Sequence, residues 1–363
     1  LARLRVSEKS VADMAEKVRS VVRLPDPLGR TLSAMELDTD LVLTRESCPI
    51  GVVAVVFESR PDVVPQVASL ALKSGNAILL KGGSEAAQSN EVLMSVWNAA
   101  LEESGVVSEA AQLLHSRADV LELLTLDRDV DLLIPRGGRE FVETISRGSR
   151  IPVLGHGEGI CHVYVDRAAD LEKAERIVLD AKLDYPAACN AAETLLVEAA
   201  IAPRFLPRVI EKLRGAGVEV RGCERTRAIV PAGVVTASER DWATEYGDLI
   251  LSVRVVDGLD QAIAHIHQYG SGHTEAIVSE DSLAAERFLS EVDAAGVYHN
   301  ASTRFADGYR YGLGAEVGIS NGKLHARGPM GLDGLTTYKY KLRGRGQTAA
   351  DYKTGKKFRH RPL

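Results

Sequence analysis

The sequence lacks the features that define several classes of protein. Its 363 residues include only four cysteines, which lie far apart and form no CxxC pair, and this argues against a disulfide scaffold and a structural zinc site. No run of 18 or more apolar residues occurs, so no segment is expected to span a membrane. The net charge of −6 argues against nucleic acid as the main partner. Unpaired thiols suit a reducing compartment, so we expect a cytoplasmic protein, or an organellar one in a eukaryote.

A regular alternation of strands and helices begins after an amphipathic helix within residues 1–23. The run from Val52 to Phe57 is continuous, apolar and rich in valine, which is typical of a strand buried on both faces. Helical and strand patterns then alternate as far as an expected strand at 151–154. Alternation of this kind predicts a parallel sheet that is covered by helices on both faces.

A second alternation follows Cys161. Residues 308–334 are rich in glycine and are expected to form a loop, 335–342 a late strand, and the remaining tail is expected to be loosely ordered. A chain of this length divides into about two domains, each built here around one parallel sheet. In the second domain we expect strands at 162–165, 194–197, 217–220, 249–256, 275–278 and 295–298, and helices at 171–183, 202–214, 258–268 and 282–290.

One cysteine stands in a segment that suits nucleophilic chemistry. Cys189, followed by Asn190, lies between a helical pattern that is expected to end at Pro186 and the strand at 194–197. Alanines on both sides leave room for a substrate carbonyl to reach the sulfur, and backbone N–H groups could hold the oxyanion that forms. The alternative is a buried cysteine that acts as a small apolar residue. A single cysteine does not decide between these interpretations.

Two strand-to-helix turns carry paired glycines. Glycines let a phosphate approach the backbone, and the start of a helix favours negative charge. Lys81, in the first turn, could therefore meet a ribose or phosphate oxygen. The alternative is a pair of tight turns, but two in one domain beside a candidate thiol strengthen the interpretation as a dinucleotide site. The residues are Lys81, Gly82, Gly83 and Ser84 in the first turn and Gly137 and Gly138 in the second.

Four stretches resemble one enzyme family in sequence and in order. They are YPAACNAAETLLV around Cys189, CPIGVVAVVFESRPDVVPQVASLALKSGNAILLKGG from Cys48, VLGHGEGICHVYVD from Val153 and FADGYRYGLGAEVGIS from Phe305. Together they span nearly the whole chain and are similar to the γ-glutamyl phosphate reductases (glutamate-5-semialdehyde dehydrogenases), a branch of the aldehyde dehydrogenase superfamily. The amino-acid sequence of these stretches is most similar to the reductase half of the bifunctional Δ1-pyrroline-5-carboxylate synthases. This resemblance implies that Cys189 is the catalytic nucleophile.

The resemblance also implies a nicotinamide cofactor at both glycine turns. Lys81 matches the lysine that aldehyde dehydrogenases place at the first turn. Many NAD-preferring members have an acidic residue three positions later, where this chain has Ser84. An uncharged residue leaves room for a 2′-phosphate, so we expect NADPH. The TEYGD segment at 244–248 resembles the one whose glutamate holds the nicotinamide ribose, which implies Glu245.

Further residues around the thiol are implied by the same resemblance. Ser59 lies nearest the family's oxyanion-binding asparagine, and its alternative role is a turn residue before Pro61. Arg60 could meet a phosphate or carboxylate, although surface arginines are common. Ser302 and Arg304 lie in the stretch that matches the substrate-side loop, and a planar guanidinium suits both the glutamyl head group and its phosphate.

Two histidine-containing patterns imitate sites that the sequence does not support. The GHGEG segment at 155–159 imitates a dinucleotide fingerprint but precedes an expected strand, whereas the fingerprint needs a helix. In the superfamily this loop carries the glutamate that activates water, and here His156 lies near that position. A reductase of an acyl phosphate must not hydrolyse its thioester, so His156 could instead manage a proton near the substrate.

His265 and His267 do not share a helix face, so we expect no metal.

We therefore expect an α/β, aldehyde-dehydrogenase-like fold with two parallel-rich sheets and a β dimerisation arm. Residues 1–160 would form the NADP-binding domain, with 30–48 in the arm, and 161–330 the thiol domain. Residues 331–363 would supply the C-terminal dimerisation strand and tail. The arm rests on the resemblance, which implies a homodimer or a higher oligomer.

The resemblance implies NADPH-dependent reduction of L-glutamyl 5-phosphate to L-glutamate 5-semialdehyde and phosphate, in proline biosynthesis. The Cys189 thiolate would attack the acyl phosphate, and Ser59 or Asn190 would help backbone N–H groups to hold the oxyanion. A glutamate 5-kinase, fused or associated, is an implied partner. Three alternatives stay open: an ordinary aldehyde dehydrogenase, a cysteine hydrolase that uses Cys189 and His156, and a non-catalytic assembly module of the same fold.

Overall fold

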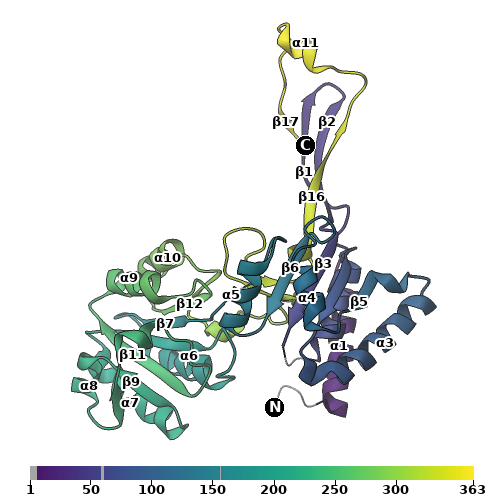
Figure 1. The fold of residues 1–363 in the computed structure, drawn as a ribbon. Helices are drawn as coiled ribbons and strands as arrows, with labels where there is room; N and C mark the ends of the chain where they lie inside the picture. The colour runs from purple at the N-terminus through teal and green to yellow at the C-terminus, as the bar shows by residue number, and fades with distance from the viewer. Residues whose placement is uncertain (1–5, 59–60, 156) are drawn as a thin grey trace.

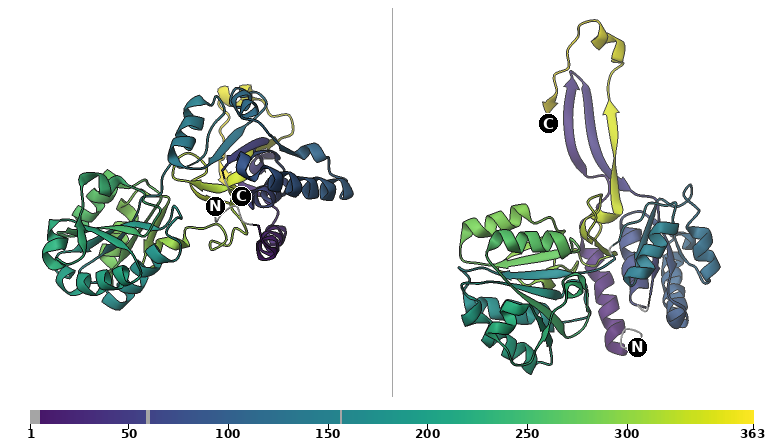
Figure 2. Two further views of the ribbon diagram at one scale, coloured as in Figure 1. Left: turned by 60° about the horizontal axis from the view of Figure 1, so that its bottom comes forward. Right: turned by 60° about the vertical axis from the view of Figure 1, so that its left-hand side comes forward.

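The computed structural model describes residues 6–58, 61–155 and 157–363. Two lobes lie side by side, and an arm projects from them (Figure 1; Figure 2). Each lobe is built on one parallel sheet, so the expected α/β architecture is confirmed. In the described part of the chain, no helix has the length and hydrophobicity needed to cross a bilayer.

The sheet of the first lobe has the strand order β5-β4-β3-β6. Successive side chains of a strand point to opposite faces, so Val53 and Val55 of β3 enter one core while Ala54 and Val56 enter another. Two buried faces explain why this strand is apolar throughout. The strands are β3 (Val52–Phe57), β4 (Ala77–Lys81), β5 (Ala111–Leu113) and β6 (Leu132–Arg136).

Helices cover both faces of this sheet. On one face lie α2 (Val63–Lys73) and α3 (Ala87–Glu103), and α1 (Glu8–Arg23) packs on α2. On the other face lie α4 (Arg117–Leu123) and α5 (Arg139–Gly148).

One expected strand of the first lobe is absent. The prediction of a strand at 151–154 is wrong, because Val153 makes only a single bridge to Leu133. Pro152 offers a carbonyl to the Leu133 N–H but has no N–H of its own, which limits any longer ladder.

The sheet of the second lobe has the strand order β10-β9-β11-β8-β7-β12-β13. Helices α6 (Leu171–Leu183), α7 (Ala202–Gly215) and α8 (Glu224–Ile229) cover one face, and α9 (Leu259–Tyr269) and α10 (Ser282–Glu291) cover the other. The sequence predictions missed the short α8 and β10. The strands are β7 (Cys161–Val165), β8 (Ala192–Glu198), β9 (Glu219–Gly222), β10 (Val234–Thr236), β11 (Ile250–Val256), β12 (Thr274–Val278) and β13 (Gly296–His299).

The arm is a four-stranded sheet in the order β16-β2-β1-β17. Its strands are β1 (Thr31–Asp38), β2 (Leu41–Pro49), β16 (Thr336–Arg343) and β17 (Arg361–Pro362). The expectation of a loosely ordered tail is wrong, because the tail contains α11 (Ala349–Lys353) and ends in β17. The buried carboxylate of Asp38 holds it, accepting from Tyr352 at 3.0 Å and Lys356 at 2.6 Å.

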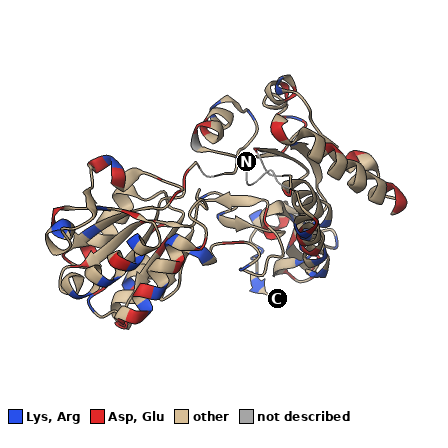
Figure 3. Cartoon of the chain, turned by 90° about the horizontal axis from the view of Figure 1, so that it is seen from below, with Lys and Arg blue, Asp and Glu red and all other residues tan. Residues whose placement is uncertain are grey.

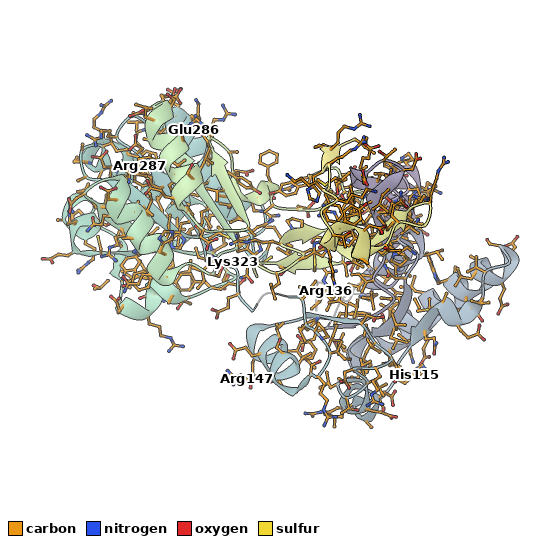
Figure 4. The ribbon with its side chains drawn as sticks, turned by 90° about the horizontal axis from the view of Figure 1, so that it is seen from above. His115, Arg136, Arg147, Glu286, Arg287 and Lys323 are labelled. Atoms are coloured by element: carbon orange, nitrogen blue, oxygen red, sulfur yellow. The ribbon has the colours of Figure 1, made fainter. Side chains whose placement is uncertain are left out.

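The glycine-rich segment between the second sheet and β16 joins the lobes. It was expected to be a loop, but it contains the paired strands β14 (Gly318–Ser320) and β15 (Gly328–Met330). Gln66 of the first lobe donates to the Glu316 carbonyl, and Asn321 donates to the Ser271 carbonyl of the second. Figure 4 shows Arg136 and Lys323 beside this crossing. Charges of both signs are interspersed over the helices of the two lobes (Figure 3).

Candidate active site

Cys189 lies in a short loop between α6 and β8. The helix covers Leu171–Leu183, as the helical pattern predicted, and Pro186 lies three residues beyond its end. Two turns follow, in which the Ala188 N–H donates to the Tyr185 carbonyl at 3.0 Å and the Ala191 N–H to the Ala188 carbonyl at 2.9 Å. Cys189 is half-buried. It is therefore not enclosed in a core, as the alternative of a small apolar residue would require.

Asn190 joins this loop to the segment that follows β13. Its side chain is buried, and its amide nitrogen donates to the Ala306 carbonyl at 2.8 Å. The amide oxygen has no hydrogen-bond partner among the described residues. Because an amide nitrogen carries two hydrogens, Asn190 can hold Ala306 and still offer one N–H. Its contact with an oxyanion stays a prediction.

The backbone of Cys189 is in close contact with the chain that leads into β7. The Cys161 sulfur lies 3.3 Å from the Cys189 carbonyl oxygen. Burial raises the pKa of the Cys161 thiol well above its ordinary value, so this group keeps its proton and can donate it to that carbonyl. A β-carbon at Gly159 would overlap the same carbonyl, so only glycine fits there. The sequence analysis gave neither residue a role.

A buried ion pair closes the base of the cysteine loop. Lys182, near the end of α6, lies 2.7 Å from Glu193, near the start of β8, and neither side chain is exposed. Burial raises the pKa of Glu193 to about 7 and lowers that of Lys182, against the mutual attraction of the pair. The sequence analysis missed this pair, although a lysine four residues after Val178, on the apolar face of α6, was an available signal.

The first glycine turn lies at the carboxyl end of β4. A β-carbon at Gly82 would overlap the side chain of Asn90 and press on Phe57. Lys81 donates to the Gly82 carbonyl at 2.6 Å, so its ammonium group lies over its own turn. Ser84 is exposed and leads into α3. The turn therefore presents small residues and a positive charge at one edge of the sheet.

The second glycine turn is already in contact with an anionic group. Gly137 and Gly138 follow β6, and Gly138 precedes the first residue of α5. The N–H of Gly138 donates to a carboxylate oxygen of Glu58 at 3.2 Å. A cofactor phosphate at this helix start would have to displace that carboxylate. Glu58 lies 80 positions away in the sequence, which is why the turn alone did not indicate it.

The segment at 155–159 connects the first sheet with the cysteine loop. A β-carbon at Gly155 would touch Pro135 of β6, and Gly159 touches the Cys189 backbone. An extended chain spans at most about 3.3–3.6 Å per residue, so these four steps cover no more than roughly 14 Å. The length of this segment consequently limits how far the Cys189 backbone can lie from the carboxyl end of β6, where the second glycine turn begins.

The expected substrate-side residues lie beside the cysteine loop but make contacts within the protein. Ser302 is buried and accepts from the Arg304 N–H at 3.3 Å, at the start of a short helical turn. The Arg304 guanidinium donates to Asp184 at 3.0 Å, and Arg310 donates to the same carboxylate oxygen. The sequence analysis named Arg304 but neither Asp184 nor Arg310.

Of the remaining residues that were predicted for the site, the structure describes some and leaves others out. Glu245 is half-buried and precedes β11, which pairs with β8, so it lies on the same edge of the second sheet as the cysteine loop. Ser59, Arg60 and His156 lie outside the described residues. Across 6–58, 61–155 and 157–363, no group of three or more potential metal-ligating side chains occurs.

Known proteins resemble this chain in sequence and in fold. Residues 3–248 match the family model described as "Aldehyde dehydrogenase family". The γ-glutamyl phosphate reductase of Synechococcus sp. (strain JA-3-3Ab) is 59% identical over 364 residues, which covers 99% of this chain and 80% of that protein. The crystal structure of γ-glutamyl phosphate reductase from Thermotoga maritima has a TM-score of 0.93 at 45% identity and covers 96% of this chain and 84% of that one. A glyceraldehyde-3-phosphate dehydrogenase from Methanocaldococcus jannaschii, complexed with NADP, shares the fold with a TM-score of 0.71 at 16% identity, over 93% and 82% of the two chains.

Proposed function

Because the chain belongs to the aldehyde dehydrogenase family, and within it to the γ-glutamyl phosphate reductases, we propose that Cys189 is the nucleophile of its reaction. The enzyme reduces L-glutamyl 5-phosphate to L-glutamate 5-semialdehyde and phosphate, a step of proline biosynthesis. The observation that supports this choice of nucleophile is the half-buried position of Cys189 in a turn of alanines, in a loop whose first residue, Asp184, pairs with two arginines.

The loop can carry out acyl transfer in two stages. The Cys189 thiolate attacks the acyl carbon, while backbone N–H groups of the loop and one N–H of Asn190 hold the oxyanion. The bond to the phosphate oxygen breaks, phosphate leaves with its electron pair, and a thioester remains on the sulfur. A bound nicotinamide supplies the hydride that reduces this thioester. The carbon–sulfur bond then breaks, which releases the aldehyde and restores the thiolate. Ser59 is proposed as a second oxyanion donor.

The first lobe fits a nicotinamide dinucleotide. Gly82 and Gly83 follow β4 at the carboxyl edge, where open α/β sheets bind ligands, and Gly82 has no space for a side chain. The proposed cofactor is NADPH, because the exposed Ser84 adds no negative charge beside the ribose. The Glu85 carboxylate folds over Gly83 and would have to swing outward for a 2′-phosphate, which its exposed position allows. Glu245 is proposed to hold the nicotinamide ribose.

Comparing the two cofactors tests this preference. The KM for NADPH should be clearly lower than that for NADH, and Ser84→Glu should raise the KM for NADPH by about tenfold or more, through repulsion of the 2′-phosphate. Ser95→Glu, an outward substitution on α3, is the matched control. A preference of the unaltered enzyme for NADH would refute the choice of cofactor.

Two further properties are proposed with the reaction. The arm, with 30–48 and 332–347, is proposed to hold a homodimer together, because β16 is an edge strand that carries exposed aromatic side chains. A cytoplasmic location is proposed because the four cysteines, all within the described residues, are unpaired.

Replacing the sulfur tests the proposed reaction. Cys189→Ser should abolish NADPH consumption when glutamate, ATP and a glutamate kinase generate the acyl phosphate in place. Cys223→Ser is the control, because Cys223 precedes α8 near the far edge of the second sheet and its replacement should leave turnover intact. Turnover by the Cys189→Ser enzyme at the unaltered rate would show that another group is the nucleophile.

A further inference from the structure

Asp184 binds two arginines at the entrance of the cysteine loop. It caps the end of α6, and one of its carboxylate oxygens accepts from Arg304 Nε and from Arg310 Nη2, each at 3.0 Å. Arg310 Nη1 also donates to the Arg304 carbonyl. Two guanidinium groups on one carboxylate leave a surplus positive charge. The pKa of Asp184 lies below its ordinary value, mainly because of the Arg310 hydrogen bond, so the carboxylate is ionised at neutral pH.

This cluster adjoins the loop that carries Cys189. The segment with both arginines is attached to the cysteine loop at two places, through Asp184 at the start of the loop and through Asn190, which donates to the Ala306 carbonyl. Cys189 is the residue immediately before the second attachment. The segment that carries both arginines is therefore held against both ends of the stretch that contains the sulfur.

The two arginines differ in what they offer. The Arg304 side chain is 10% exposed and is fixed within the protein, whereas Arg310 is 37% exposed. A guanidinium has five N–H donors, and the hydrogen bonds of Arg310 among the described residues use two of them. Asp307, on the same turn, accepts from the backbone N–H groups of Tyr309 and Arg310. A planar group with unused donors is therefore accessible to solvent at the start of the cysteine loop.

We propose that Arg310, together with Arg304, binds the phosphoryl group of the acyl phosphate, and that Asp184 is the residue that positions both guanidinium groups. The inference rests on the proposed function and adds its phosphate subsite. A single arginine would suffice to neutralise Asp184, and the second leaves a positive charge that an anionic ligand can meet. Guanidinium groups match phosphate through paired N–H donors. When the Cys189 thiolate displaces the phosphate, the departing oxygen gains negative charge beside Arg310, which lowers the barrier to its departure.

Running the reaction backwards isolates the phosphate. In this direction the semialdehyde, NADP⁺ and inorganic phosphate yield the acyl phosphate and NADPH, so a separate KM is measured for phosphate and for the semialdehyde. Arg310→Gln should raise the KM for phosphate by about tenfold or more, the loss expected for a charge-assisted hydrogen bond. The KM for the semialdehyde should change less than about twofold. Arg310→Lys keeps one charge but loses the planar fork, so its KM for phosphate should lie between those of the unaltered enzyme and the Arg310→Gln enzyme.

Arg287 provides the matched control. It lies on α10, points outward in Figure 4, and bridges the carboxylates of Asp260 and Glu291. Arg287→Gln therefore removes an arginine that also bridges two partners, but far from the thiol, and it should leave both KM values unchanged.

The possible outcomes separate the subsite from the reaction. A raised KM for the semialdehyde at an unchanged KM for phosphate would show that Arg310 serves the glutamyl head group, and would overturn the proposal. A KM for phosphate that stays unchanged, whatever happens to kcat, would show that Arg310 does not bind the phosphate and would overturn the proposal, and so would an equal rise in both KM values. If the unaltered enzyme forms no NADPH from the semialdehyde and phosphate, the proposed function itself fails.

Discussion

The ammonium nitrogen of Lys182 lies 2.7 Å from a carboxylate oxygen of Glu193, and both side chains are completely buried. Lys182 is the last residue but one of α6, and Glu193 is the second residue of β8. The pair therefore fixes the distance between the two ends of the loop that carries Cys189. The other Glu193 oxygen accepts from the Gly247 N–H at 3.1 Å, which ties the segment of Glu245 to the same base.

Breaking this pair should destabilise the fold strongly. Lys182→Met leaves the Glu193 carboxylate buried without its cation, and such a change costs about 3–5 kcal/mol in the free energy of unfolding. Replacing both residues, as Lys182→Met with Glu193→Leu, should recover much of that loss, because no lone charge remains buried. Urea unfolding curves of the three proteins measure the difference. If the Lys182→Met variant were as stable as the unaltered chain, the pair would not support the loop.

The contribution of Glu193 to stability should decline as the pH rises from about 4.5 to about 7. Burial raises the pKa of this carboxyl to about 7 in the folded chain, from an ordinary value of 4.5. Between these values the folded chain keeps a proton that the unfolded chain has lost, so each rise in pH favours unfolding. Urea unfolding across this window should show a steeper decline for the unaltered chain than for Glu193→Gln, which does not titrate. Equal slopes would contradict the raised pKa.

A side chain at position 159 should disturb catalysis more than folding. Gly159→Ala places a β-carbon where the Cys189 carbonyl lies, so the cysteine loop must shift. Misplacement of a reacting group by about 1 Å can lower turnover by about 10²-fold. Gly215→Ala is the control, since no atom lies near a β-carbon at that position at the end of α7. The comparison needs kcat and the melting temperature of each variant, and normal kcat in Gly159→Ala would mean that the loop tolerates the shift.

Removing the apolar side chains of β16 should separate the proposed dimer. Tyr338, Tyr340 and Leu342 alternate along this edge strand and are 48%, 62% and 56% exposed. Exposed rows of this kind mark association surfaces, and one important interface side chain contributes about 2 kcal/mol or more. The triple serine variant should sediment as a smaller species than the unaltered protein at the same concentration. Val92→Ser with Val96→Ser, on the exposed face of α3, should not change sedimentation.

The order of elements was predicted well because it depends on local patterns. The expected strand at Val52–Phe57 and the expected helix at 171–183 agree with the observed bounds, since a continuous valine-rich run and a helical repeat are each visible within a few residues. The family resemblance, the α/β fold and the reaction are confirmed by the similarity to γ-glutamyl phosphate reductases. The errors fall on the expected strand at 151–154, the missed α8 and β10, the glycine-rich segment and the tail. The tail shows the reason most clearly, because β17 forms only by pairing with β1, near the other end of the chain.

The candidate site shows the same contrast between local patterns, which the sequence reveals, and contacts between distant residues, which it does not. The places of Cys189 and of the paired glycines between a helix and a strand were predicted from the sequence, because small neighbours and flanking elements are local properties, and their roles in catalysis and cofactor binding stay predictions. The partners of these residues were not recognisable. Arg310 lies 126 positions from Asp184, Glu58 lies 80 from Gly138, and Cys161 lies 28 from Cys189.

The sequence by itself thus determined most of the segments that become strands and helices and which cysteine stands among small residues between a helix and a strand, and it predicted where a dinucleotide could approach the backbone. Only the tertiary structure decided which charges meet: Lys182 with Glu193 under the loop, and Arg304 with Arg310 on Asp184 at its entrance. The physical reason is that a hydrogen bond or ion pair depends on a separation of about 3 Å between two atoms. That separation is set by how whole elements pack, and no periodicity along the chain records it.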